Sequence, residues 1–510
     1  MRVSLIYPPV GQVEDNSALK AQERHLGIFP PLSLCYVASV ILEAGHEVDL
    51  VDANALRLDV ADVVERVRRY EPDLLAFTVF THSFHVNLSW IRDLKARLDL
   101  PVLVGGQHVG LYPRETLSHP TIDYGLIGEA ESNLPALLRA LETGGHLANV
   151  PNLCFRRDGA VVINPSGPRD RNVDEIPLPA RHLLPNDRYA SFLTRRRNFT
   201  AMVTSRGCPF RCSFCAQRAP TRLRSPERVI EEIEQCYHEL GIREIDIFDT
   251  TFTVKKSRAQ EICERLTEKR LDLEWMARTR CDLVDRKLLE AMAASGCRLI
   301  MYGIESAEEE ILKALSKETS MARVRDAVRW TQEAGIQTLG FFMIGSPGET
   351  HETARRTIRF ARELRLDHIQ CTKVTPFPGT ELYEDYLART GDDRWRRHVL
   401  DSSERGEFEL LGTTLTAAEA QRYVRRMYLQ FYFRPWHILR LFLGAGSIQL
   451  VLRFAVAAID MLLSREHVAK KASRTSRAVA LPLARATNEA PIPDAPADRA
   501  PTGALVPAVG

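Results

Sequence analysis

The sequence predicts an α/β protein with at least two domains built on parallel sheets. A helix-like stretch closes on a glycine and a short apolar run follows at four places, namely Gly45, Gly241, Gly296 and Gly335. A glycine just past a helix, followed by a β-rich run, is typical of α/β units. Strands that alternate with helices form parallel sheets. The length of 510 residues also exceeds what one hydrophobic core covers and suggests roughly two to four domains.

The first predicted domain covers residues 1–145. Its candidate strands are 3–8, 46–52, 73–79, 101–106 and 122–128. Five strands in this order resemble a flavodoxin-like (Rossmann-type) doubly wound sheet, which binds ligands beyond the carboxyl ends of its strands. Glycine-containing or polar turns follow those ends, at 8–11, 81–83, 105–108 and 128–131. Glycines there permit close approach of a ligand to the backbone; the alternative is that they only make tight turns.

Residues 146–198 read as a linker that contains a β-hairpin around Asp158 and a proline-rich stretch. The second α/β domain is predicted over 199–384. Its candidate strands are 199–207, 245–253, 274–280, 299–307, 340–350 and 370–380. The first helix should open at Ser225, an N-cap residue followed by Pro226. Each of the six repeats delivers polar residues or glycines to one rim, the face on which barrel folds carry their active sites.

The C-terminal part divides into a helical, amphipathic region over 385–469 and a tail over 470–510 that is expected to be disordered. Within it, 447–463 is strongly apolar but contains Arg453 and Asp460, which makes it a poor membrane span. We expect a helix that packs on the barrel. The alternative is a helix on a membrane surface, followed by the basic residues Lys470, Lys471, Arg474 and Arg477.

Composition narrows the class of protein. A hydrophobic content of 45%, a charged content of 26% and a net charge of +2 are ordinary for a globular protein and give no reason to expect a nucleic-acid partner. The chain starts with a strand-like segment and its ten cysteines are thinly spread, so we expect a cytoplasmic protein with free thiols. Seven cysteines should be small buried apolar residues, namely Cys35, Cys154, Cys236, Cys263, Cys281, Cys297 and Cys371.

The remaining three thiols, Cys208, Cys212 and Cys215, have C-x3-C-x2-C spacing. A cubane iron–sulfur cluster normally takes four thiolates, so three within eight residues would leave one iron open for chemistry. The alternative, a structural zinc site, usually needs four ligands from two separated pairs. The spacing favours a cluster.

The chain resembles the cobalamin-binding radical S-adenosylmethionine (SAM) enzymes over about 1–465, a family in which the N-terminal domain binds cobalamin and the second is a partial (β/α)6 barrel. The matching segments are CPFRCSFC, FDTTFT, YGIES, IGSPGET, TPFPGT, GGQH and GEAES. Residues 425–437 resemble the closing segment of the branch with the anaerobic magnesium-protoporphyrin ester cyclase and the class B methyltransferases. In this family a reduced 4Fe-4S cluster cleaves SAM to methionine and a 5′-deoxyadenosyl radical.

The resemblance also implies site residues. Cys208, Cys212 and Cys215 should hold the cluster. The expected SAM contacts are Phe214 at the adenine, the turn of Asp249, Thr250 and Thr251 at the methionyl amino group, and Glu305, Ser306 and Gly345 at the ribose and carboxylate. The expected contacts of the cobalamin nucleotide tail are Ser83, Gly105 and Gly106.

One departure concerns cobalt. The D-x-H-x-x-G ligand motif of many cobalamin proteins is missing, because the place after the first strand reads from Tyr7 to Gly11. His82, His85 and His108 are expected to be polar surface or turn residues. The family often binds cobalamin without a protein ligand on cobalt, so the axial ligand stays open; a degenerate domain that binds nothing is the alternative.

The resemblance therefore predicts a methyltransferase that acts on an unactivated carbon of a small-molecule or lipid-like metabolite. The runner-up is a cobalamin-dependent oxidative cyclase or another non-methylating radical SAM oxidoreductase, and a third possibility is a non-catalytic cobalamin or metal sensor. The expected partners are a hydrophobic or other small-molecule substrate and an external one-electron reductant such as flavodoxin or ferredoxin, with no nucleic acid. Contact with the inner face of the membrane is the alternative to a wholly cytoplasmic location.

Overall fold

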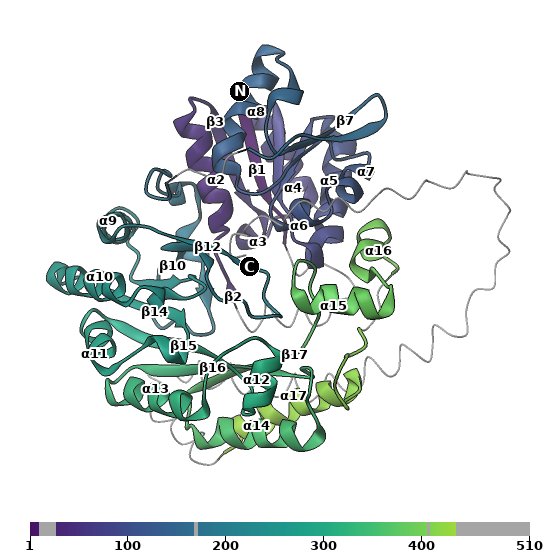
Figure 1. Ribbon diagram of the computed structural model, residues 1–510. Helices are drawn as coiled ribbons and strands as arrows, with labels where there is room; N and C mark the ends of the chain where they lie inside the picture. The colour runs from purple at the N-terminus through teal and green to yellow at the C-terminus, as the bar shows by residue number, and fades with distance from the viewer. Residues whose placement is uncertain (10–26, 168–171, 405–407, 435–510) are drawn as a thin grey trace. The chain divides into compact units, whose positions relative to one another are not determined.

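The computed structural model describes residues 1–9, 27–167, 172–404 and 408–434 of the chain (Figure 1). The described residues up to Val424 belong to one compact unit, and a second unit begins at Arg425. The predicted helix over 447–463, the tail from 470 and the turn residue Gly11 lie outside the described residues. Apart from the end of helix α17 (Ala417–Tyr432), everything below concerns the first unit.

The N-terminal domain is built on a seven-stranded sheet with the order β3-β1-β4-β5-β6-β7-β8. The strands are β1 (Arg2–Tyr7), β3 (Glu47–Asp52), β4 (Leu74–Thr78), β5 (Val102–Gly105), β6 (Tyr124–Leu126), β7 (Leu153–Arg157) and β8 (Ala160–Ile163). The first five are parallel, in the doubly wound order expected from the sequence. The hairpin expected around Asp158 is β7–β8, and it extends this sheet through antiparallel pairing of β7 with β6.

Helices cover both faces of this sheet. One core cluster combines the apolar sides of α2 (Leu32–Glu43) and α8 (Ala130–Thr143) with strand residues. A second cluster contains α4 (Val60–Tyr70) and α5 (Phe84–Leu98). Three short helices, α3 (Ala53–Leu56), α6 (Gln107–Leu111) and α7 (Pro113–Ser118), follow strands β3 and β5. Short helices thus begin close to the carboxyl ends of β3 and β5.

The second domain contains six parallel strands that pair in chain order, with β10 and β17 at the edges of an open sheet. They are β10 (Phe199–Met202), β13 (Glu244–Ile247), β14 (Glu274–Thr279), β15 (Cys297–Glu305), β16 (Gln337–Ile344) and β17 (His368–Lys373). The intervening helices are α9 (Pro226–His238), α10 (Lys256–Lys269), α11 (Arg286–Ala294), α12 (Glu309–Ala314), α13 (Met321–Glu333) and α14 (His351–Glu363). The partial barrel expected from the six repeats is therefore present.

Local sequence explains where helices begin and where the chain turns into the next strand in these repeats. Helix α9 begins where expected, because Ser225 Oγ accepts a hydrogen bond from the Arg228 amide and Pro226 occupies the first helical position. Gly296 has a φ of +91°, and a Cβ there would lie 2.4 Å from the Leu273 carbonyl oxygen. Only glycine permits this close turn into β15.

The linker does more than join the domains. Leu184 and Tyr189 belong to the same buried cluster as Leu5 of β1 and as Phe199 and Met301 of the barrel. Tyr189 also donates a hydrogen bond of 2.7 Å to Asp52 at the end of β3. The N-terminal sheet, the linker and the barrel therefore share one hydrophobic core.

The chain returns to the N-terminal domain after β17. Helices α15 (Glu381–Thr390) and α16 (Arg394–Leu400) precede α17 (Ala417–Tyr432). Trp395 and Val399 of α16 pack in the cluster that contains α4 and α5, and the His119 ring lies 3.1 Å from the Val399 carbonyl oxygen. Among the helices described, none is both long and apolar enough to cross a membrane.

Candidate functional site

The three thiols of the motif lie on a loop that is closed by a short ribbon. Strand β11 (Ser205–Cys208) pairs antiparallel with β12 (Ala219–Leu223). Gly207 makes the ribbon possible, since its φ is +82° and a Cβ would lie 2.6 Å from the Pro220 carbonyl oxygen. Ser213 anchors the loop: its amide donates to the Leu315 carbonyl at 3.0 Å, and its carbonyl accepts from the Leu382 amide at 2.9 Å.

The loop supplies three sulfur donors from one segment. Cys208 is buried, whereas Cys212 and Cys215 are partly exposed. Burial raises the pKa of Cys212 and that of Cys215, the latter to about 11, while Lys317 and Arg280 act to lower the pKa of Cys212. Across the described ranges no three His, Cys, Asp or Glu side chains already converge on a complete metal site. The donor set fits a cluster that takes three thiolates from the protein.

Arg280 connects this loop with the end of β14. Its guanidinium lies 4.0 Å from the centre of the Phe210 ring, within the cysteine loop. It also pairs with Asp282 at 2.9 Å and donates to the Glu318 carbonyl at 2.8 Å. Arg280 is therefore fixed beside the loop, as Lys317 is near Cys212. It lies at the end of the predicted strand 274–280, where polar residues are expected.

Asp249 is fully buried and faces the neighbouring strand end. Its carboxylate accepts 2.6 Å hydrogen bonds from the amide and hydroxyl of Thr204 and a 3.0 Å bond from the Ser205 amide. Thr251 Oγ1 lies 4.0 Å from the sulfur of Cys208, and Thr250 is partly exposed. The Asp249 carboxylate thus orders the start of the cysteine ribbon, and the exposed group of the predicted SAM turn is Thr250.

Glu305 ends β15 in an unusual backbone conformation, with a φ of +66°. Its carboxylate pairs with Lys317 at 2.8 Å, and both side chains are more than nine-tenths buried. A Cβ on Gly303 would lie 2.6 Å from Lys317 Nζ and 2.7 Å from Glu305 Oε1, so the glycine leaves room for the pair. Non-glycine residues in this region store strain, which is typical of functional sites.

The other predicted SAM residues lie at the ends of neighbouring strands. Ser306 is fully buried, 3.4 Å from the Thr357 hydroxyl, and Phe214 is partly exposed in the cysteine loop. Gly345 has a φ of +95° after β16, and its amide donates to the Glu349 carboxylate. Burial raises the pKa of Glu349 to about 7, and no described residue forms a hydrogen bond with its Oε1.

The strand ends of the N-terminal domain provide an open cradle. A Cβ on Gly105 would meet nothing within 4 Å, and the same is true of Gly128, whose φ is +78°. Gly106 is held against β4, because a Cβ there would lie 2.8 Å from the Val79 carbonyl oxygen. Ser83 is buried and its carbonyl accepts from Asn87 at 3.0 Å. Glycines that leave space at these ends fit a large ligand such as cobalamin.

The histidines differ from expectation in one case. His108 is completely buried, its Nδ1 lies 3.1 Å from Thr81 Oγ1, and its Nε2 has no hydrogen-bond partner among the residues that the structure describes. Burial lowers its pKa to about 3, so the ring is neutral. It is a core residue next to the cradle and not the surface or turn residue expected. His82 is exposed, as expected, and the His85 ring contacts the His398 carbonyl of α16.

Several residues at the site carried no usable sequence signal. Lys317 lies between α12 and α13 and Arg206 lies in β11, and neither stands in a polar turn after a long strand. Glu129 and Glu131 lie at the turn 128–131 expected after β6. Their side chains contact Arg206 of the cysteine ribbon.

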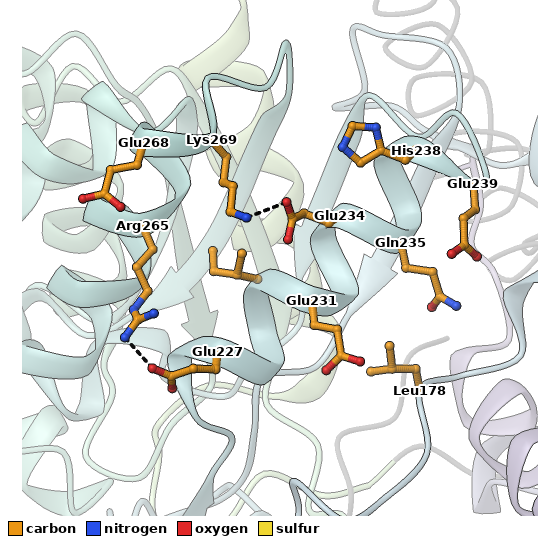
Figure 2. A pocket seen from close by; sticks show the side chains of 11 residues that line it. Leu178, Glu227, Glu231, Glu234, Gln235, His238, Glu239, Arg265, Glu268 and Lys269 are labelled. Carbon is orange, nitrogen blue, oxygen red and sulfur yellow. Dashed lines mark hydrogen bonds and ion pairs between the residues drawn. The ribbon is translucent and has the colours of Figure 1, made fainter.

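A surface groove lies elsewhere on the barrel. It has a volume of about 530 Å³ and lies between α9 and α10, with Leu178 at its rim (Figure 2). Figure 2 shows glutamates along α9 facing Arg265 and Lys269 of α10, and Lys269 pairs with Glu234 at 2.7 Å. None of its lining residues belongs to a strand end or to the cysteine loop, so the groove is separate from the candidate site.

Two family profiles match the chain. The radical SAM superfamily matches residues 202–361, and the B12 binding domain matches residues 24–138. The first match contains the three cysteines and strands β13 to β16, and the second contains the glycine cradle after β5 and β6.

Curated relatives agree with these matches. An uncharacterized methyltransferase of Pyrococcus horikoshii is 34% identical over 85% of this chain and 93% of its own length. The anaerobic magnesium-protoporphyrin IX monomethyl ester cyclase of Rubrivivax gelatinosus is 28% identical, over 70% of this chain and 66% of the cyclase. The hopanoid C-3 methylase of Methylococcus capsulatus is 27% identical, over 69% of this chain and 67% of the methylase.

A solved structure has the same fold. The radical SAM methyltransferase TsrM from Kitasatospora setae, with cobalamin and a [4Fe-4S] cluster bound, superposes with a TM-score of 0.62. The match covers 76% of this chain and 75% of TsrM at 20% sequence identity.

Proposed function

Because the chain belongs to the cobalamin-binding radical SAM enzymes, and its relatives include methyltransferases, we propose that it methylates an unactivated carbon of a small-molecule or lipid-like metabolite. A reduced 4Fe-4S cluster with SAM supplies a carbon-centred radical in this family, and cobalamin supplies the methyl group. The observation that carries the proposal is that the three-thiol loop and the glycine cradle belong to one compact unit, in which Glu129 and Glu131 after β6 contact Arg206 of the cysteine ribbon.

The residues of the barrel divide the work of binding. Cys208, Cys212 and Cys215 would hold the cluster. Glu305, Ser306, Thr250 and Gly345 lie at strand ends around the loop and would bind SAM, with Phe214 at the adenine. Asp249 would act through Thr204, by fixing the backbone that leads into Cys208.

The cradle would hold the second cofactor. Gly105 leaves space at the end of β5, whereas Gly106 packs closely against Val79. The neutral His108 ring in α6 has a nitrogen without a hydrogen-bond partner among the described residues. No histidine of the D-x-H-x-x-G motif follows β1, so the cradle would hold cobalamin without that histidine.

The lipid-like part of the proposal is supported by the hopanoid methylase among the relatives. Phe377, exposed by 45% just past β17, adds an apolar ring at the barrel rim and stacks on Trp395 at 5.5 Å. An external one-electron reductant of the flavodoxin or ferredoxin type would reduce the cluster.

The test is an anaerobic reconstitution with iron, sulfide and cobalamin, followed by incubation with SAM, reductant and extracts fractionated by polarity. We expect about four irons per chain, one bound cobalamin, 5′-deoxyadenosine, and a product heavier by one methylene and labelled from methyl-labelled SAM. A chain that binds the cluster but no cobalamin would overturn the methyltransferase proposal.

The cyclase relatives favour one alternative, an oxidative cyclisation with the same cofactors. The product mass separates the two reactions, because cyclisation adds no methyl group. A labelled methyl group in the product supports methyl transfer. A product without the label, formed together with 5′-deoxyadenosine, supports the alternative.

A further inference from the structure

The ribbon that closes the cysteine loop has an electrostatic defect of its own. Arg206 of β11 and Arg222 of β12 stand directly opposite each other in the antiparallel register. Like charges at opposed positions destabilise a strand pair. Arg206 is the more buried of the two, with 7% of its side chain exposed against 27% for Arg222.

The N-terminal domain supplies the compensating charges. Glu129 lies between the two arginines: one carboxylate oxygen is 3.0 Å from Arg206 Nη1 and the other accepts from Arg222. Glu131 accepts from the second nitrogen of Arg206. Burial opposes the charge of Arg206, but the two carboxylates outweigh it and raise its pKa. Tyr36 of α2 adds a ring 5.4 Å from the guanidinium.

The carboxylate of Glu129 does not cap its own helix. Glu129 is the N-cap residue of α8, yet its side chain caps no backbone amide there. Both carboxylates extend to the ribbon instead. These pairs lie close in sequence to both cofactor sites. Gly128 of the open cradle directly precedes Glu129, and one residue, Gly207, separates Arg206 from Cys208.

We propose that Glu129, Glu131, Arg206 and Arg222 are positioning residues through which the cobalamin-binding domain orders the cysteine loop. The loop takes its cluster-binding geometry only while the turn after β6 neutralises the arginine pair of its ribbon. The inference rests on the proposed role of the loop as cluster site, but the connection itself can be tested without cofactors.

The first experiment is hydrogen–deuterium exchange on the full chain without cofactors. Glu129→Gln combined with Glu131→Gln should speed exchange of the amides of 205–223 by roughly tenfold, because the buried Arg206 and the partly buried Arg222 then lose their carboxylate partners. Arg298→Gln is the matched control. It breaks a comparably buried pair with Glu244 near the amino ends of the strands, so it should leave 205–223 unchanged. Unaltered exchange in the glutamine double variant would overturn the proposal.

The sign of one substitution provides a second test. Arg222→Gln alone removes a partner of Glu129 and should speed exchange of the ribbon. In a Glu129→Gln background, Arg222 has already lost this partner and only repels Arg206. Arg222→Gln then removes the repulsion and should slow exchange of the ribbon amides. Independent structural roles would give effects of the same direction in both backgrounds, which would refute the connection.

The cluster provides a spectroscopic reading of the same pairs. In reconstituted protein, Glu129→Gln should alter the electron paramagnetic resonance spectrum of the reduced cluster, and adding Arg222→Gln should move it back towards wild type. A wild-type spectrum in Glu129→Gln would contradict positioning of the loop. If methyl transfer is never detected, the exchange and spectroscopic results still decide the inference.

Discussion

Each cysteine of the loop has a defined part at the residue scale. Cys212→Ala should remove bound iron and abolish 5′-deoxyadenosine formation, because two thiolates cannot hold the cluster. Iron analysis and product chromatography measure both effects. Cys236→Ala is the matched control, since this thiol is fully buried in α9, away from the loop. Retained SAM cleavage in Cys212→Ala would contradict the assignment of the site.

The pair of Lys317 and Glu305 provides a second prediction at this scale. Lys317→Met should leave the Glu305 carboxylate buried without its cation, at a cost of about 3–5 kcal/mol in the free energy of unfolding. SAM binding should weaken in the same variant. Denaturant titration and equilibrium binding measure the two effects. Lys313→Met, which breaks an exposed pair with Glu310, should change neither; equal losses in both variants would refute a special role for Lys317.

Residues of the site could be predicted unevenly. The cysteines stand at a spacing that only a few chemistries use, and glycines after strands such as Gly105 are visible locally. Lys317 and Arg206 could not be found in this way, since their partners lie 12 and 75 residues away along the chain. Such pairs follow from tertiary packing, which the local pattern does not contain.

At the scale of elements, the turn between β16 and α14 predicts a pH effect. Burial raises the pKa of Glu349 from its ordinary value of 4.5 to about 7. The folded state therefore binds this proton more tightly, and the resulting stability is complete below pH 4.5 and lost as the pH rises through 7. The side chain of Glu349→Gln does not titrate. As the pH rises from 4.5 to above 7, the free energy of unfolding of the variant should therefore increase by roughly 3 kcal/mol relative to that of the wild type.

Denaturant titrations of both proteins at several pH values measure this difference. Parallel stability curves for wild type and Glu349→Gln would show that the carboxyl group does not titrate in this range.

Elements were the most predictable level. All eleven strands expected from the apolar runs are present, and a glycine just before the strand marks four of them, at Gly45, Gly241, Gly296 and Gly335. The pairing of β7 with β6 was not predictable. A hairpin shows its own turn in the sequence, but the edge on which it docks depends on which strand is left unpaired elsewhere.

At the scale of the whole molecule, α16 connects the end of the barrel to the N-terminal domain. Val399 is fully buried in the core of that domain, whereas the next residue, Leu400, is 50% exposed. Val399→Asp should cost about 3–5 kcal/mol in stability, because it buries a charge without a partner. Leu400→Asp should be nearly neutral. Thermal and chemical unfolding compare the two, and equal losses would show that α16 does not pack as described.

The core that runs from Leu5 through Tyr189 to Met301 has a consequence for engineering. Moving the N-terminal domain or the barrel alone into a chimaera would divide this shared core and expose its apolar side chains to water. An exchanged cobalamin-binding domain must therefore include the linker. The barrel residues that pack against the linker must be redesigned in the recipient. Substrate specificity is more practical to change in the loops at the barrel rim, because substitutions there leave the shared core intact.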